Sequence, residues 1–265
     1  MKASDDPLLR KSTCFRLIIL FGAFIFESCA HVYYLPGNPN VPLFTEKYEF
    51  HGSLSTGGGA ITSGTDVQAA LSLTNHIAVM TNFMSSKYSS NNSNNGNMSK
   101  GTYFEGAAGY FKPFYEYGVF EIYGGVGTGS QHHEYDAWPG NIYRGQADLS
   151  FAKAFIQPSL GVTFNAFDIA LSSGFSRLNF KRMDNSVDPN SMYYDDLDMI
   201  ASNRISFLFE PAITVRGGWK FVKIQLQYLL SLNLTNNYLN FEPGKLSVGI
   251  YISLSKKYMN EISKK

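Results

Sequence analysis

The sequence is poor in charged residues and in cysteine. Charged residues make up 16% of its 265 positions, against roughly 25% in an average soluble domain. The formal net charge is +1, and the chain holds two cysteines. These shortages disfavour a disordered tail, a coiled coil and a basic nucleic-acid binder, so we expect no nucleic-acid partner. Two cysteines are also too few for a disulfide framework.

The apolar run near the N-terminus is too short for a membrane-spanning helix. Residues 17–26, LIILFGAFIF, are ten apolar positions in a row, whereas such a helix needs about 20. A mildly basic stretch precedes this run, and small residues follow it. That order predicts a secretory signal peptide over residues 1–28.

The two cysteines lie on either side of this apolar run. Ser28 stands directly before Cys29 in the sequence FESCA, which resembles the signal of bacterial lipoproteins. The resemblance implies that Cys29 begins the mature protein and carries acyl chains, which anchor a protein stably. The alternative is a Cys14–Cys29 disulfide or two idle thiols. Cys14 precedes the apolar run and would be cleaved away, so we favour a covalent lipid on Cys29 and expect no other cofactor.

The next segment, residues 29–46, is rich in proline. Three prolines fall within seven residues, which precludes a regular helix or a central strand. We therefore predict an extended, lipidated tether between the anchor and the folded body. The residues after Cys29 are Ala30, His31 and Val32, without the acidic residues found in surface-exported lipoproteins of the Bacteroidota. This predicts an anchor in the inner, periplasm-facing leaflet.

From residue 47 onward the sequence is dominated by glycine, aromatic residues and period-two alternation. It contains 24 Gly, 21 Phe and 17 Tyr, and its mean hydropathy is −0.13. Alternation of apolar and polar residues indicates half-buried strands. It predicts ten strands, over residues 47–58, 65–74, 76–87, 101–112, 117–130, 147–164, 168–181, 203–216, 220–233 and 244–255.

The alternation is clearest in the last strands. In residues 244–255, five aliphatic residues share one face and small or polar residues share the other. Five same-face aliphatics cover the thickness that a tilted strand of about 9–11 residues spans in a bilayer. Residues 203–216 and 220–233 show the same division. The apolar face is therefore predicted to meet lipid.

The connections between predicted strands alternate between short turns and long polar loops. Long links fall at residues 88–100, 131–146 and 182–202, which is the pattern of outer-membrane barrels. We therefore predict an all-β fold, a closed antiparallel transmembrane barrel of eight to ten strands over residues 47–255, followed by a basic periplasmic tail over residues 256–265. An even strand number places both termini on the periplasmic side. The alternative fold is a soluble β-sandwich on a lipid anchor.

If the aliphatic face meets lipid, the opposite face lines a narrow lumen. Small barrels fill such a lumen with side chains, and buried charges persist when paired. We expect a plugged, non-conducting lumen with an ion-pair network, against the alternative of a small hydrophilic pore. The expected members are Glu49, His51, Glu105, Glu121, Lys153, Glu210, Arg216 and Lys223.

Two histidine groups are candidates for catalysis. His132 and His133 stand in the predicted loop at residues 131–146, but adjacent residues of an extended chain point to opposite sides, a poor geometry for one metal. His51 and Ser53 share a strand face, but that face is the predicted lumen, and no third group orients the histidine. We predict no catalytic residue and no metal site.

The opening of the predicted mature chain, YYLPGNPNVPLFTEKYE, followed by alternating strands, resembles small outer-membrane barrel proteins of Bacteroidota that carry a lipoprotein signal. The resemblance itself implies no activity. We expect a non-enzymatic barrel that contacts outer-membrane lipid and other outer-membrane proteins. Its expected role is that of a structural or accessory subunit of an outer-membrane complex, in protein assembly, secretion or envelope integrity. A rim-active hydrolase, either a protease or a lipid deacylase, is the alternative.

Overall fold

A computed structural model describes residues 31–59, 61–89, 97–136, 144–235 and 239–255. The chain divides into two compact units, residues 1–31 and residues 32–265, and the description below concerns the second. The predicted signal peptide, Cys29 and the basic tail lie outside the described residues. Within the described part of the chain, no helix combines the length and hydropathy needed to cross a bilayer.

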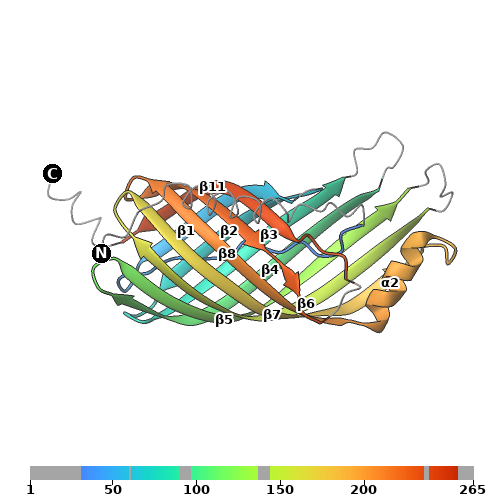
Figure 1. Cartoon of the computed structure of the whole chain (residues 1–265), viewed down its shortest axis with the longest axis horizontal. Coiled ribbons are helices and arrows are strands. Elements are labelled where there is room, and N and C mark those ends of the chain that lie inside the picture. The colour runs from blue at the N-terminus through green and yellow to red at the C-terminus, as the bar shows by residue number, and fades with distance from the viewer. Residues whose placement is uncertain (1–30, 60, 90–96, 137–143, 236–238, 256–265) are drawn as a thin grey trace, which may run out of the picture. The chain divides into compact units, whose positions relative to one another are not determined.

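Ten long antiparallel strands form one sheet (Figure 1). The strands in chain order are β1 Phe50–Gly58, β2 Thr62–Ser72, β3 Ile77–Ser89, β4 Met98–Phe114, β5 Gly118–Tyr135, β6 Gly145–Thr163, β7 Phe167–Asn185, β8 Ile205–Gly218, β9 Val222–Leu230 and β11 Gly244–Leu254. The two-residue strand β10, Leu232–Asn233, continues β9 beyond a break, and helix α2 spans Met192–Ser202.

The sheet closes on itself. Each strand from β1 to β7 pairs with the next, β8 pairs with β9, β9 pairs with β11, and β11 returns to pair with β1. This confirms the predicted closed antiparallel barrel and its ten strands. Pro211 stands at one interruption of the ladder, because β8 pairs with β10 through Phe209 and with β9 only from Ala212 onward. A proline has no N–H to donate to such a ladder.

The two ends of the barrel differ. We call the end with the short connections at residues 73–76, 115–117, 164–166 and 219–221 the turn end, and the opposite end the loop end. Strands β4 to β7 are 17–19 residues long and extend at the loop end into segments that the sequence analysis assigned to loops. Helix α2, which was not predicted, also lies at this end (Figure 1).

Helix α2 begins with a capping interaction and packs on one side only. Ser191 accepts a hydrogen bond from the Tyr193 N–H, as an N-cap serine does. Tyr193, Leu197 and Ile200 are buried against the barrel mouth. Their spacing is helical, but acidic residues interrupt the apolar pattern, which explains why periodicity alone did not reveal the helix.

The outer face of the barrel is apolar around its whole circumference. Every long strand exposes aliphatic or aromatic side chains outward. Examples are Leu54, Phe104, Ile156, Ile224 and Ile250, which are 54–63% exposed. Monomeric soluble proteins rarely expose a contiguous apolar patch beyond a few hundred Å². This arrangement is the reverse of a soluble sandwich, whose apolar faces pack together.

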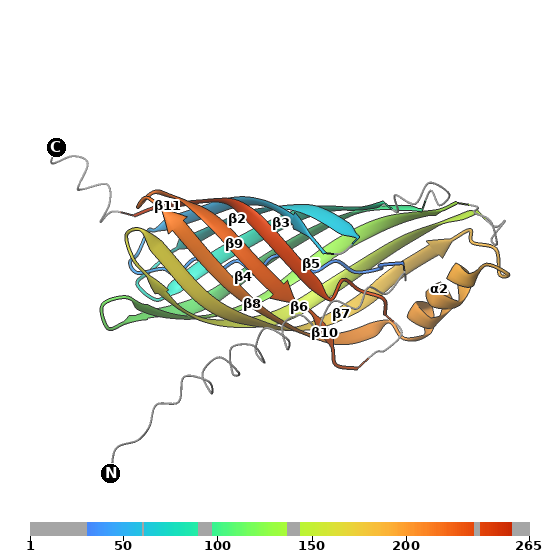
Figure 2. The same ribbon diagram turned by 45° about the horizontal axis from the view of Figure 1, so that its top comes forward.

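The segment predicted to be an external tether lies inside the barrel. Residues 33–44, which we call the lumen segment, are buried except at Gly37 and run as an extended chain from the loop end to the turn end (Figure 2). Three prolines keep it extended, as expected from the sequence. Its position is different because the lumen side chains supply hydrogen bonds to its backbone. Val32 therefore lies at the loop end, whereas Ser255 follows β11 at the turn end.

Candidate functional site

The middle of the lumen segment is held through its carbonyl groups. Side chains from four different strands donate hydrogen bonds to four successive carbonyl oxygens: Gln227 to Pro39 at 2.9 Å, Gln157 to Asn40 at 2.7 Å, Arg216 to Val41 at 2.6 Å and Tyr251 to Pro42 at 2.8 Å. Buried backbone carbonyls need such partners. The barrel wall therefore recognises the backbone of this segment, one residue after another.

Asn38 anchors the segment to a second group of wall residues. Its backbone N–H and its side-chain amide both donate to the Asp66 carboxylate, over 3.1 and 3.2 Å. Gln68 Nε2 donates to the Asn38 carbonyl over 2.7 Å. Asp66 is itself paired with Lys245 at 2.7 Å, so a buried ion pair and the lumen segment share one hydrogen-bond network.

The loop end of the lumen is closed by aromatic packing. Tyr33 and Tyr34 are buried in one cluster with Tyr193 and Leu197 of α2. The Tyr33 N–H donates to the Asn240 carbonyl over 2.8 Å. Helix α2 and the first residues of the lumen segment therefore cover this mouth of the barrel together.

The packing of α2 against the barrel mouth partly buries the carboxyl group of Asp196. Asp196 accepts a hydrogen bond from Asn240 Nδ2 over 3.3 Å. Partial burial and the neighbouring Asp195 charge raise the pKa of Asp196, and the bond from Asn240 opposes them. The charged form of Asp196 therefore disfavours the docked helix.

The turn end is closed around Phe44. Its ring stacks on the His51 imidazole with centroids 4.7 Å apart, and its N–H donates to Glu121 Oε1 over 3.1 Å. His51 also contacts Glu49 at 3.1 Å and the Tyr251 hydroxyl at 2.6 Å. His51 is thus fully engaged in a buried hydrogen-bond network. Ser53, its candidate partner, donates to Gln68 instead, over 2.9 Å.

All eight residues expected in the lumen network have buried side chains that face the interior. Their partners differ from those we expected. Of the expected carboxylates, only Glu210 pairs with an expected cation, Lys153, at 2.6 Å. Among the described residues, Glu105 and Glu121 are held by neutral donors, and Glu49 by His51 and backbone N–H groups.

Three charged strand residues that face the lumen were missed. Asp66, Asp168 and Lys245 are each at most 3% exposed. Lys223 pairs with Asp168 at 2.6 Å, and Arg216 lies 3.9 Å from the same carboxylate. A sequence signal for them existed. Each lies two residues from another buried residue of its strand, as Asp66 lies two residues from Gln68.

A small cavity lies beside the lumen segment. The cavity lined by Gly37, Pro39, Lys153 and Gln157, among others, holds about 20 Å³. That is room for a single water molecule. Within the described residues, no group of three or more His, Cys, Asp or Glu side chains is placed to hold a metal ion.

The two adjacent histidines lie on opposite faces, as an extended chain requires. His133 is buried inside the barrel, 5.2 Å from the Tyr33 ring, whereas His132 is on the outer face. His132 Nδ1 binds Asp148 at 2.8 Å, and its Nε2 lies 3.3 Å from Glu134. In a Ser-His-Asp triad, the nucleophile is hydrogen-bonded to Nε2 of the histidine. Among the described residues, none is hydrogen-bonded there.

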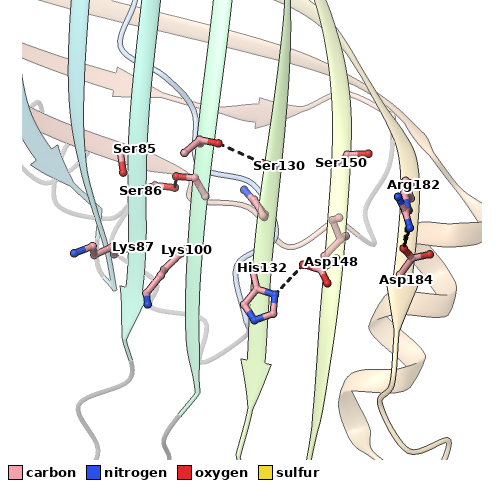
Figure 3. A pocket seen from close by; sticks show the side chains of 14 residues that line it. Ser85, Ser86, Lys87, Lys100, Ser130, His132, Asp148, Ser150, Arg182 and Asp184 are labelled. Carbon is pink, nitrogen blue, oxygen red and sulfur yellow. Dashed lines mark hydrogen bonds and ion pairs between the residues drawn. The ribbon is translucent and has the colours of Figure 1, made fainter.

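A hollow surrounds His132 on the outer face near the loop end. It has a volume of about 550 Å³, and Figure 3 shows its side chains on neighbouring strands. Serine and threonine residues line the side toward the middle of the barrel, and charged residues line the side toward the loop end. These charged residues are Lys87, Lys100, His132, Asp148, Arg182 and Asp184.

Neither a protein-family model nor a curated protein matches this sequence. The fold is similar to solved outer-membrane barrels. The translocator domain of the autotransporter NalP from Neisseria meningitidis aligns at 8% identity, with a TM-score of 0.48, over 93% of this chain and 95% of that one. An outer membrane channel from Pseudomonas putida F1 aligns at 10% identity, with a TM-score of 0.37, over 83% and 100%.

LpxR from Salmonella typhimurium aligns at 8% identity, with a TM-score of 0.36, over 76% of this chain and 99% of that one. These neighbours differ widely in what their names describe. At such identities and TM-scores, the likeness concerns the barrel architecture and carries no argument about activity.

Proposed function

We propose that this protein is a non-enzymatic, non-conducting outer-membrane barrel that acts as a structural or accessory subunit of an outer-membrane complex. Two features of the structure support the proposal. The outer face is apolar around the barrel, which suits a position in lipid. The lumen is filled by the lumen segment, which leaves little space for solutes.

The continuous backbone recognition of residues 39–42 is the observation on which the proposal depends most. A transport pore needs a continuous polar path, whereas here four wall side chains are hydrogen-bonded to the chain that fills it. Breaking these contacts would expose buried donors and the paired charges around them, each at a cost of about 1–3 kcal/mol. A sealed barrel whose outer surface remains available suits an accessory role better than transport.

The proposal includes a lipid on Cys29 and contacts with other outer-membrane proteins. The inner-leaflet position of this lipid was predicted from the residues that follow Cys29, and it stays a prediction. Mass spectrometry of the membrane-extracted protein tests the lipid directly. A mature N-terminal peptide that carries acyl chains on Cys29 supports it, and an unmodified Cys29 in that peptide contradicts it.

Single-channel recording tests the sealed lumen. The purified full chain in planar bilayers is expected to be silent, and a steady open conductance would overturn the proposal. The matched variant is Arg216→Met, which removes the hydrogen bond to Val41 and the contact of the guanidinium with the Tyr251 ring, 3.8 Å from its centroid. We expect brief openings in this variant. The subunit role is tested by crosslinking in intact cells, where recovery of the barrel alone would count against it.

A further inference from the structure

The outer face of β3 to β7 changes character in regular steps toward the loop end. Because opposite residues in the ladder share a face, the register defines rows that cross the strands. One row is apolar on β2 to β4, where Val67 stands opposite Phe83 and Phe83 opposite Phe104, and it continues as Thr128 and Ala152 on β5 and β6. We call the part on β3 and β4 the aromatic row. The next row toward the loop end, which we call the hydroxyl row, consists of Thr65, Ser85, Thr102, Ser130 and Ser150 on β2 to β6 and ends at Arg182 on β7.

The row beyond it is charged. This charged row consists of Lys87, Lys100, His132, Asp148 and Asp184, in that order across the strands. Its two halves differ in how the charges are compensated. Asp148 binds His132 at 2.8 Å, and Asp184 binds Arg182 at 2.5 Å. In the described part of the chain, Lys87 and Lys100 have no carboxylate partner.

The two lysines stand directly opposite each other in the ladder between β3 and β4. Like charges in that position destabilise a sheet. Both side chains are exposed, and Figure 3 shows them at one side of the hollow around His132. Two adjacent cations without carboxylates, next to a row of hydroxyl donors, form a surface that favours a multiply charged anion.

The position of this surface identifies the kind of anion. The lysines lie two rows away from Phe83 and Phe104, which are 44% and 54% exposed and belong to the apolar outer face. An amphiphile can therefore place its acyl chains on the aromatic row and its headgroup on the rows beyond. A soluble anion would gain nothing from the aromatic row.

We propose that Lys87 and Lys100 form a binding site for the phosphate headgroup of a membrane lipid in the leaflet at the loop end. Ser85 and Thr102 donate further hydrogen bonds to the headgroup, and the lipid chains cover Phe83 and Phe104. Phosphate suits the site because it accepts several charge-assisted hydrogen bonds. This inference rests on the proposed membrane position of the barrel.

Native mass spectrometry of the detergent-solubilised full chain tests the site. The probe is phosphatidic acid, and phosphatidylcholine, which carries a compensating cation, is the comparison lipid. We expect preferential binding of phosphatidic acid, and we expect Lys87→Gln/Lys100→Gln to weaken it about tenfold. The matched control is Lys112→Gln, because Lys112 is an exposed lysine near the turn end. Equal binding by the wild type and the double variant would overturn the assignment.

Two further measurements separate the possible outcomes. Inorganic phosphate in excess is expected to leave the lipid bound, and complete displacement would show a free-anion site in place of a lipid site. Heat-modifiable gel migration verifies that each variant is folded. A conducting wild-type barrel that still binds phosphatidic acid through the two lysines would overturn the sealed lumen but not the lipid site. A silent barrel without selective binding of phosphatidic acid would overturn the lipid site but not the sealed lumen.

Discussion

The Tyr34 hydroxyl donates a hydrogen bond to Glu210 of β8 over 3.0 Å, across a separation of 176 residues. The same hydroxyl accepts a hydrogen bond from Lys153 of β6 over 3.0 Å. The lumen segment therefore completes an ion pair between two strands of the wall. Without this hydroxyl, both charges lose a partner in a place that water hardly reaches.

Tyr34→Phe is expected to destabilise the barrel by about 1–3 kcal/mol, because it leaves buried charged groups with one partner fewer. Urea titration of the protein in micelles, followed by heat-modifiable gel migration, measures the loss. Tyr115→Phe is the control, since Tyr115 is 98% exposed at the turn end. An unchanged transition for Tyr34→Phe would show that the hydroxyl contributes nothing to stability.

Gly161 is expected to tolerate no side chain. A Cβ atom there would approach Leu43 of the lumen segment and the Ile169 carbonyl to 2.8 Å. Gly161→Ala should therefore overpack the interior, at a cost of about 1–3 kcal/mol. Gly106 is the matched position, because the nearest atom to its added Cβ is 3.9 Å away.

We expect Gly106→Ala to remain within about 0.5 kcal/mol of the wild type. Both variants are compared in the same urea titration. Equal stability of the two would mean that the lumen segment yields easily to the wall, contrary to the tight packing described above.

The apolar outer face predicts that the cost of a charged substitution depends on its depth in the bilayer. Ile250 is the central member of the outward aliphatic set of β11 and is 54% exposed. Ile250→Arg should cost about 2–4 kcal/mol in a bilayer, whereas Thr65→Arg in the hydroxyl row should cost about 0–1 kcal/mol. Folding titrations into lipid vesicles measure both values. Similar costs at the two positions would contradict the membrane position of the barrel.

The docking of α2 is expected to depend on pH through Asp196. The pKa of its carboxyl group is raised in the folded state, so its contribution to stability is present below the ordinary aspartate pKa. That contribution is lost as the pH rises through the folded pKa. Because the group is partly exposed to solvent, the effect is expected to stay below about 1 kcal/mol.

Asp196→Asn should keep α2 docked at the higher pH and remove the pH dependence. Hydrogen exchange of the α2 amides, corrected for intrinsic rates, is the measurement. The control is Asp198→Asn, because Asp198 is exposed on the same helix. Equal effects of the two variants would place the origin of the pH dependence elsewhere.

Much of the wall was predictable from residue order. A side-chain period of two assigns each strand residue to one of two faces, and this was sufficient to place Glu210, Arg216 and Lys223 inside and Ile224 and Ile250 outside. The same rule would have placed Asp66 and Lys245 inside. Strand ends were less predictable, because nothing in the alternation of β4 to β7 shows where the ladder stops.

The sequence by itself determined the closed barrel with an apolar exterior and a charged interior, because face assignment is a local property. Only the tertiary structure decided what fills the interior and which charges meet. Lys223 pairs with Asp168 and Lys245 with Asp66 because strand register, set by the closure of the whole sheet, brings them together. Residues 33–44 enter the lumen because their carbonyls find donors on four strands, a match that no short window of sequence contains.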